Sequence, residues 1–353
     1  MLYIKYLPFL VLLYWVLPPR FAFYIIFFST YLLSSLRTDY GPDYYSYYEI
    51  YLAISESPLR VLNDQKFKDV EPAFKFLTSI IKWLSLGFSS YLFIISFLIL
   101  APIFYTFHKY SKKIFPIFIF LTFFYQSWAF SGIRQALALS LSFFAFYLIA
   151  NQDSRIKGLF IIMIAISMHY SATICLLCFP FLTRVFSIKK YILFLFSFVI
   201  FAQVFSDFIF NPDFLKLFAN RILFYLDDNS SVSVLKLTWR FFLFVMVTVF
   251  YLRMGYRLTD FDRKIIQFFL VFFPLFVLFQ EVEIVSTQTS IYPLMLLCFI
   301  PSIVSKYLIL KSSKILFFTL FITAALFYYY SVLNYTLFAS EANMSRKNIL
   351  LID

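Results

Sequence analysis

The sequence predicts an all-α, polytopic integral membrane protein. Hydrophobic residues make up 62% of the 353 residues and charged residues only 14%, and the mean hydropathy is +0.85. A soluble core does not need so large an apolar share. Stretches without Asp, Glu, Lys or Arg also recur along the chain, and a helix needs about 20 residues to cross the hydrocarbon layer. Both observations exclude a soluble fold and predict a single membrane domain over residues 1–353.

Each uncharged stretch is a candidate for one or more membrane helices. The stretches cover residues 6–19, 21–36, 83–108, 114–133, 135–152, 158–183, 191–206, 265–280, 284–305 and 315–340. The first of them has no basic start and no small-residue cleavage site. We therefore expect it to be a membrane helix and not a cleaved signal peptide.

Basic residues predict the orientation, because short cytoplasmic loops collect Lys and Arg. The predicted cytoplasmic segments hold 16 basic residues against three acids, and they are Arg20, 108–113, 151–157, 184–190, 253–264 and Lys306 with Lys311 and Lys314. External loops are expected near 37–88, 207–235 and 281–289, which hold 13 of the 18 acids. The net charge of +12 thus reflects topology, and no nucleic-acid partner is expected.

Alternation between the two faces then predicts about ten transmembrane helices. They lie near 6–19, 21–36, 89–107, 114–130, 132–150, 189–206, 236–254, 265–280, 290–305 and 315–338. Residues 158–183 stand between two basic loops on the same face, so we expect a short helical hairpin with His169 at or near its turn. Irregular backbone at this depth is tolerated inside protein or against a wet cavity, so the hairpin should line one.

His169 is one of two histidines, and it lies in 26 residues that contain no acid, lysine or arginine. Few local acceptors exist beyond Tyr170 and Ser171, so a functional histidine is favoured over a satisfied core histidine. The three cysteines lie in apolar runs, and the pair Cys175 and Cys178 has no second pair or nearby histidine. Packed thiols are therefore expected, and no metal site.

The external segment 37–51 is rich in groups that bind phosphates and sugars. A turn at Gly41 and Pro42 should hold Arg37 and Asp43 close together. A structural ion pair is one interpretation of these two residues, and a phosphate-binding guanidinium is the other. The six tyrosines either settle at the lipid–water interface or offer flat rings to sugars.

Two further segments carry ionisable candidates. Pro72 and apolar residues at 73, 74, 76, 77, 80, 81 and 84 predict an amphipathic helix along the outer interface. Glu71 before it either favours the helix dipole or has a catalytic or binding role. Arg134 opens the uncharged helix 135–152, one turn inside the membrane. Because charges at such depth usually face a cavity or a polar partner, function is favoured over a snorkelling arginine.

Four short motifs follow one another in the first half of the chain. They are Arg37 with Gly41, Asp43 and Tyr47; Glu71-Pro72; Gly132-x-Arg134-Gln135-Ala136; and Ala165-x-x-Met168-His169-x-Ser171-Ala172. Their order and spacing resemble the EpsG-like branch of the Wzy-type bacterial polysaccharide polymerases. Two positions depart from that family, which generally has phenylalanine where Met168 stands and an arginine shortly before Tyr292. Arg221 or Arg240 is expected to substitute for this arginine.

The resemblance implies a GT-C-like glycosyltransferase in the bacterial inner membrane, with its active site facing the periplasm. Its donor would be a growing glycan on undecaprenyl pyrophosphate, and its acceptor a lipid-linked repeat unit delivered by a flippase. A chain-length regulator would be a further partner. The product would be an O-antigen, lipopolysaccharide, capsule or exopolysaccharide chain.

Such a reaction needs cations for the departing pyrophosphate and a base for the acceptor hydroxyl. Arg37 and Arg134 are the first candidates for the cations, and Arg221 and Arg240 are the next. For the base we prefer His169, because the unperturbed pKa of histidine, about 6.5, leaves a neutral imidazole at neutral pH. Asp43 is the second candidate for the base and Glu71 the third.

Sugar contacts and cofactors complete the expectations. The candidate sugar-binding residues are Tyr40, Tyr44, Tyr47, Gln135, Tyr170, Glu281 and Tyr292. No Asp-x-Asp or similar oxygen cluster is present, so metal-independent transfer without a cofactor is expected.

Three other functions stay open. An O-antigen ligase differs only in its acceptor. A membrane-bound acyltransferase also keeps a histidine in an apolar segment, but its usual asparagine and aromatic-histidine-glycine context is absent. A glycan transporter typically has polar residues and broken helices at the midplane of paired halves, whereas the ionisable groups here gather toward one face.

Overall fold

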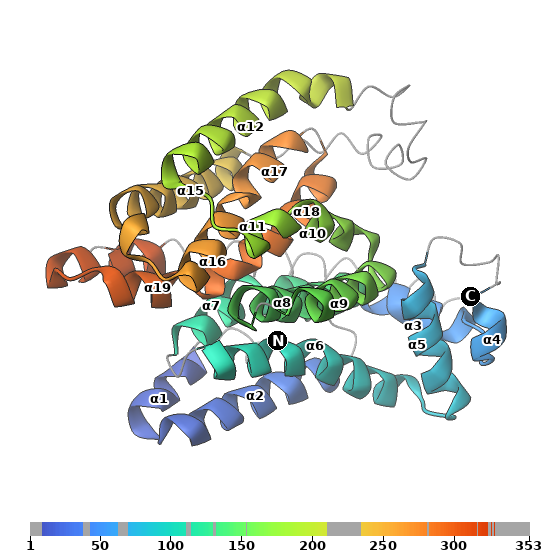
Figure 1. Ribbon diagram of the computed structural model, residues 1–353. Helices are drawn as coiled ribbons and strands as arrows, with labels where there is room; N and C mark the ends of the chain where they lie inside the picture. Colours follow the sequence, from blue (N-terminus) through green and yellow to red (C-terminus); the bar gives the residue numbers. More distant parts are fainter. Residues whose placement is uncertain are drawn as a thin grey trace. The chain divides into compact units, whose positions relative to one another are not determined.

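The computed structural model describes residues 9–37, 43–62, 70–110, 114–129, 132–152, 154–209, 234–280, 282–315, 317–323, 326 and 328. Within these ranges the regular structure is helical and contains no strand, so the predicted all-α class is confirmed there (Figure 1). The chain divides into two compact units. Unit 1 comprises Met1–Ala145, Leu159–Tyr170 and Ile315–Asp353, and unit 2 comprises Phe146–Gly158 and Ser171–Lys314. The single domain over 1–353 stays a prediction.

Four helices within the described ranges are long and apolar enough to cross a membrane. They are Phe88–Tyr110, Ile133–Asn151, Leu237–Arg257 and Glu283–Tyr307. Each one overlaps a span predicted from the sequence, and together with the composition they make the chain a helical membrane protein. In the described residues 9–18 of the predicted first span, the α-helical residues are those of α1 (Leu13–Val16), and the total of ten stays a prediction.

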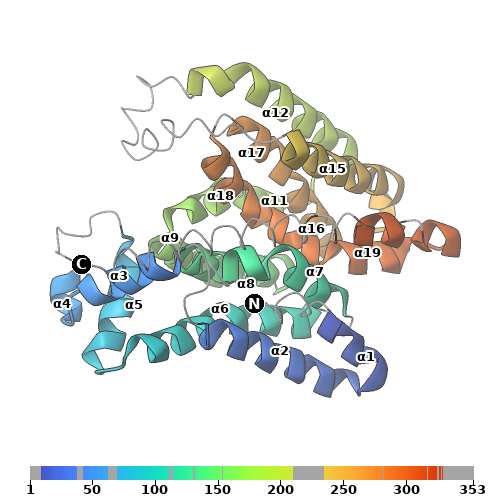
Figure 2. The ribbon, with the colours of Figure 1, turned by 180° about the vertical axis from the view of Figure 1, so that it is seen from behind.

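Unit 1 is built around a close pair of helices. Its elements after α1 are α2 (Pro19–Ser35), α3 (Tyr44–Ala53), α4 (Pro58–Val61), α5 (Pro72–Trp83), α6 (Phe88–Tyr110), α7 (Phe115–Phe123), the π-helix η3 (Tyr125–Ala129), the first part of α8 (Ile133–Gln152) and most of α9 (Arg155–Met168). Helix α2 runs beside α6 (Figures 1 and 2). The buried face of α2 includes Ala22, Ile26, Thr30 and Ser34 at helical spacing, and small side chains among them permit close approach.

The π-helix η3 is fixed to this helix pair through Tyr125. The Tyr125 hydroxyl donates to the Thr30 carbonyl at 2.9 Å and lies 2.9 Å from Ser34 Oγ. Single π-turns inside helical segments often occur at functional sites. Here the turn anchors the end of α2, which directly precedes Arg37.

Helices α3, α4 and α5 lie together (Figure 2). The helix predicted from Pro72 is confirmed as α5, which ends at Trp83 and is followed by Ser85 in the left-handed region. Its buried face differs from the apolar pattern, because Lys75, Thr78 and Ser79 are buried whereas Phe76 is 40% exposed. Lipid accepts apolar side chains but not unsatisfied polar groups, so the polar side of α5 turns inward.

Helix α9 ends at Met168, and His169 follows it in irregular backbone. The predicted break at His169 is therefore confirmed. At 14 residues, α9 spans about 21 Å, less than the hydrocarbon thickness of about 30 Å. The chain then continues into unit 2 through the 3-10 turn η4 (Tyr170–Thr173), and the return of the hairpin stays a prediction.

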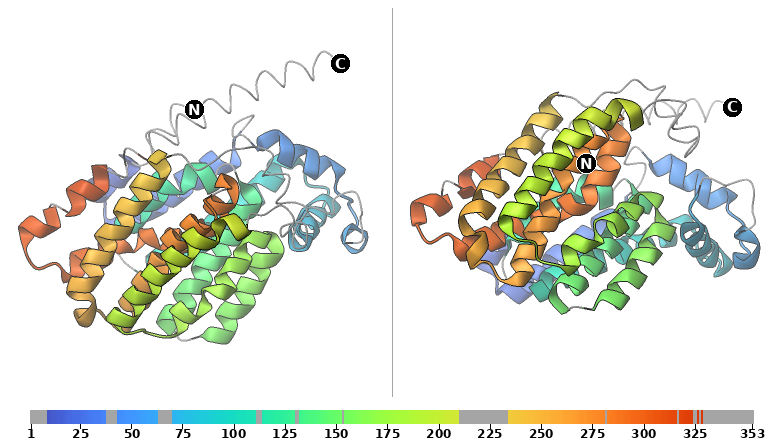
Figure 3. Two further views of the ribbon diagram at one scale, coloured as in Figure 1. Left: turned by 90° about the horizontal axis from the view of Figure 1, so that it is seen from above. Right: turned by 45° about the horizontal axis from the view of Figure 1, so that its top comes forward.

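Unit 2 is also helical. Its elements are α10 (Ile174–Leu177), α11 (Phe179–Thr183), α12 (Ile188–Ile209), α15 (Val234–Met254), η5 (Gly255–Arg257), α16 (Asp260–Leu270), α17 (Phe272–Leu278), α18 (Glu283–Leu294), η6 (Met295–Cys298) and α19 (Ile300–Tyr307). Helices α12, α15 and α17 lie side by side (Figure 3). The buried Gln267 joins α16 to the loop after α11, because its amide donates to Phe186 O at 2.7 Å and accepts from Phe186 N at 3.2 Å.

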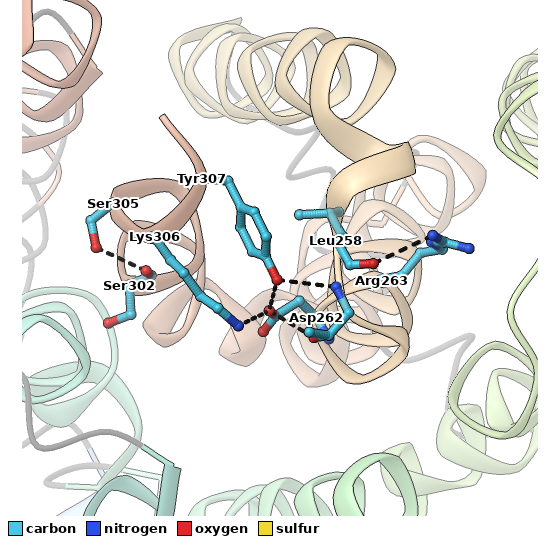
Figure 4. Close-up of polar contacts among 8 residues, drawn as sticks. Leu258, Asp262, Arg263, Ser302, Ser305, Lys306 and Tyr307 are labelled. Carbon is cyan, nitrogen blue, oxygen red and sulfur yellow. Dashed lines mark hydrogen bonds and ion pairs between the residues drawn. The ribbon is translucent and has the colours of Figure 1, made fainter. Parts of the chain in front are cut away.

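Asp262 connects the start of α16 to the end of α19 (Figure 4). Its Oδ2 accepts from Lys306 Nζ at 2.8 Å, from the Tyr307 hydroxyl at 2.7 Å and from Thr259 Oγ1 at 2.8 Å. The side chain of Asp262 is 5% exposed. Both of these helix ends come from segments that the sequence predicts to be cytoplasmic, so the contact agrees with their assignment to one face.

Replacing Asp262 by Asn should lower the free energy of unfolding by about 2 kcal/mol, because a charged acceptor of three hydrogen bonds is lost. Thermal unfolding of the detergent-purified protein measures the change. Asp260→Asn is the matched control, since Asp260 lies in the same first turn but is exposed. Equal melting temperatures for the two variants would contradict a stabilising role of the Asp262 contacts.

Candidate active site

Glu71 lies at the centre of a charged cluster in unit 1. Its Oε2 accepts a hydrogen bond from Arg134 Nη1 at 2.8 Å, and its Oε1 lies 4.0 Å from His169 Nε2. The second distance permits an ion pair with a protonated imidazole but is too long for a hydrogen bond. The Glu71 side chain is 2% exposed. One buried carboxylate thus binds a guanidinium with one oxygen and approaches an imidazole with the other.

The local backbone explains how Glu71 reaches these partners. Glu71 is the N-cap of α5 and has extended backbone, with Pro72 in the first turn. Its side chain makes no capping hydrogen bond with α5, so the carboxylate can turn toward Arg134. Arg134 lies in the first turn of α8, where backbone amides have no partner inside the helix. The Arg134 amide donates instead to the Tyr47 hydroxyl at 3.3 Å.

Tyr47 supports the cluster from α3. The side chain is 7% exposed, and its ring centroid lies 6.2 Å from that of Phe74 on α5. Burial raises the pKa of the Tyr47 phenol, and the Arg134 guanidinium opposes the rise. Tyr47 therefore contacts both α5 and α8, with its ring mostly covered by protein.

Arg37 and Asp43 extend the cluster. Arg37 is 5% exposed, and burial lowers its pKa, whereas the nearby phenols of Tyr125, Tyr47, Tyr91 and Tyr44 favour its charged form. Burial raises the pKa of Asp43, and the charges of Arg134 and Arg37 oppose this shift. Asp43 thus lies in the field of both arginines, and the predicted turn at Gly41 and Pro42 lies outside the described residues.

The other predicted residues of unit 1 are each next in the chain to a residue of the cluster. Tyr44 is half-buried, with ring centroids 5.5 Å from those of Tyr45 and Phe88. Gln135 follows Arg134 in α8 and is 4% exposed. Tyr170 follows His169 and is 52% exposed. Of the two tyrosines, Tyr170 has the more accessible ring.

Two predicted residues belong to unit 2. Arg240 is 5% exposed, and its guanidinium carbon lies 3.7 Å from the ring centroid of Phe276. Tyr292 is fully buried, and its hydroxyl lies 2.9 Å from Ser171 Oγ. Tyr40, Arg221 and Glu281 lie outside the described residues.

Sequence reasoning missed three residues at this cluster. Tyr125 and Tyr91 interact with Arg37, and Lys75 is buried on α5 one turn after Glu71. The spacing of Glu71, Lys75 and Thr78 places them on one helical face, and this polar spacing was the available signal for Lys75. In the part of the chain that the structure describes, no three His, Cys, Asp or Glu side chains gather in a way that could hold a metal ion.

A family model described as the EpsG family matches residues 20–344. The chain belongs to the EpsG family. The resemblance first drawn from four motifs is therefore confirmed and extends over nearly the whole chain. No curated protein and no solved structure matches this EpsG-family protein. The family supports a role in polysaccharide polymerisation for the chain.

Replacing Glu71 by Gln should lower the free energy of unfolding by about 2 kcal/mol, because the Arg134 guanidinium loses its counter-charge. A larger loss is not expected, since the Arg134 side chain remains 20% exposed. The double variant Glu71→Gln/Arg134→Met should lose less than the two single variants together. Thermal unfolding in detergent measures all three, with exposed Glu49→Gln as control. Strictly additive losses would contradict a coupled ion pair.

Proposed function

We propose that this EpsG-family protein is a Wzy-type polysaccharide polymerase. It joins undecaprenyl-pyrophosphate-linked repeat units by metal-independent glycosyl transfer at the periplasmic face of the bacterial inner membrane. The observation that carries the proposal is the contact of one buried carboxylate, Glu71, with both Arg134 and His169. This arrangement places a cation for a phosphate leaving group beside an imidazole that can act as a base, and Arg37 adds a second cation nearby.

The proposed fold has about ten transmembrane helices, a short hairpin and a GT-C-like arrangement. The interactions between the segment 37–88 and the ends of α8 and α9 support the proposed topology. Asp43 and Glu71 come from the acid-rich segment 37–88, and they interact with Arg134 and His169. Arg134 starts α8 and His169 follows the end of α9, so both stand at the helix ends away from the basic loop between these helices. The cluster would therefore face the periplasm.

The reaction that we propose is a single displacement step on the donor. The acceptor hydroxyl oxygen forms a bond to the anomeric carbon while the bond from that carbon to the pyrophosphate oxygen breaks. The hydroxyl proton moves to His169 Nε2, and undecaprenyl pyrophosphate leaves with the bonding electron pair. Arg37 and Arg134 stabilise the charge that grows on the leaving oxygens, since fixed cations in a water-poor site act without reorganisation.

Glu71 and Asp43 have supporting roles in this reaction. Glu71 stabilises the imidazolium that forms when His169 takes the proton, because an opposite charge nearby favours the charged form. One carboxylate oxygen of Glu71 is engaged by Arg134, so we propose Glu71 as a partner of the imidazole and not as the base. Asp43 balances the two arginines when the site is empty.

The further substrate contacts are proposed for each unit by itself. Tyr44, Tyr170 and Gln135 are the sugar contacts proposed in unit 1, and Tyr47 holds Arg134. Tyr292 and Arg240 of unit 2 are proposed for the second substrate, as are Tyr40, Arg221 and Glu281 in the external segments. A flippase would deliver the repeat units, and a chain-length regulator would be the further protein partner.

Replacing His169 by Ala should reduce polymerisation by about 100-fold or more, as expected for loss of a general base. Cells carrying this variant should retain single-repeat product and lose the ladder of long chains on a polysaccharide gel. The control is His108→Ala, because His108 is the only other histidine and is exposed at the end of α6.

Long chains of normal abundance from the His169 variant would rule out its role as base. Deletion of the gene separates the neighbouring functions. Loss of the ladder with one repeat retained supports a polymerase, whereas loss of even the one-repeat band indicates ligation or export.

A further inference from the structure

The inward face of α5 carries a cation that the reaction described above does not use. Lys75 is 6% exposed, although a lysine side chain is rarely so buried. In the described part of unit 1, only Arg37 and Glu71 are charged side chains of comparable burial. Lys75 stands in the turn that Glu71 begins, because its amide donates to the Glu71 carbonyl at 3.0 Å.

The ammonium group of Lys75 has no protein partner within the described part of the chain. A carboxylate four residues earlier is the usual partner of a helical lysine, but Glu71 binds Arg134 at 2.8 Å instead. No hydrogen bond or ion pair joins the Lys75 side chain to another described residue. The Lys75 ammonium is not among the fully buried polar atoms that lack a partner, so a ligand can reach it, and a cation that the described residues leave unpaired favours an anion as its partner.

The charge balance of the cluster also favours an anionic ligand. Arg37 and Arg134 are matched by Asp43 and Glu71, so these four residues together carry no net charge. Lys75 supplies the surplus positive charge that a diphosphate needs. Helical side chains lean toward the N-terminus of their helix, so the Lys75 side chain covers the turn at which Glu71 stands. The first-turn amides of α5 are also not capped by the Glu71 side chain, and such amides favour anions.

We propose that Lys75 binds the diphosphate of the lipid-linked donor and supplies the surplus positive charge of the site. This assignment rests on the proposed function for the identity of the lipid. A lysine suits the role because its ammonium is a compact point charge that follows a phosphate as the glycosidic bond breaks. Lys75 is thus a substrate-binding residue of the proposed donor site.

The test compares Lys75→Met and Lys75→Arg with the wild type as full-length protein in detergent. Binding of undecaprenyl diphosphate should weaken about tenfold or more in Lys75→Met, since a charge-assisted hydrogen bond is lost, and should stay within about threefold in Lys75→Arg. Binding of undecaprenyl monophosphate should change less. Lys109→Met is the control, because it removes the same charge from an exposed lysine of α6.

A second measurement needs no variant and therefore does not depend on how Lys75→Met folds. In the wild type, undecaprenyl diphosphate should slow amide hydrogen exchange across α5, and undecaprenyl monophosphate should slow it less. Unchanged exchange in α5 overturns the assignment of Lys75, as does a Lys75→Met variant that binds the diphosphate with wild-type affinity.

The polysaccharide ladder in cells separates this assignment from the proposed function. A wild-type chain that binds the diphosphate through Lys75 but builds no ladder refutes polymerisation and leaves the binding role of Lys75 intact. A wild-type chain that builds the ladder but does not bind the diphosphate refutes the role of Lys75 and leaves polymerisation intact.

Discussion

The ion pair between Glu71 and Arg134 is the interaction on which the rest of the candidate site depends. It joins side chains 63 residues apart in the sequence at 2.8 Å, and the carboxylate is almost completely buried. A charge in such a place must be paired, so the start of α5 is held at the start of α8. Tyr47 reinforces this contact through the Arg134 amide. The second oxygen of Glu71 then faces His169. The starts of α5 and α8 and the break after α9 meet in this way.

The membrane explains why unit 1 buries its polar side chains and exposes many aromatic ones. In lipid, an apolar side chain is well solvated outside the protein, whereas a polar group must find a partner inside. Helix α5 follows this logic, with Lys75 and Thr78 inward and Phe76 outward. Helix α2 does the same, since Thr30 and Ser34 are fully buried against Tyr125. The aromatic surface therefore requires no protein partner to account for it.

The sequence predicted those features that single residues determine. Pro72 marked the start of α5, and the position of His169 between two basic loops marked the end of α9; both are confirmed. The inward face of α5 was not predicted, because the apolar pattern alone does not tell whether water or lipid lies outside. Tyr125 was missed because a π-turn has no periodic signal, and the division into two units depends on contacts distant in sequence.

The shared carboxylate has a consequence for the proposed reaction. Positive charge would appear on His169 as the proton arrives, while negative charge grows on the departing diphosphate. Glu71 stands between the imidazole and Arg134, so the imidazolium would draw it away from Arg134 when the diphosphate needs that guanidinium most. The 4.0 Å separation of His169 from Glu71 leaves room for this approach. Proton transfer and stabilisation of the leaving group would then be coupled through one carboxylate, because each step strengthens the interaction that the other requires.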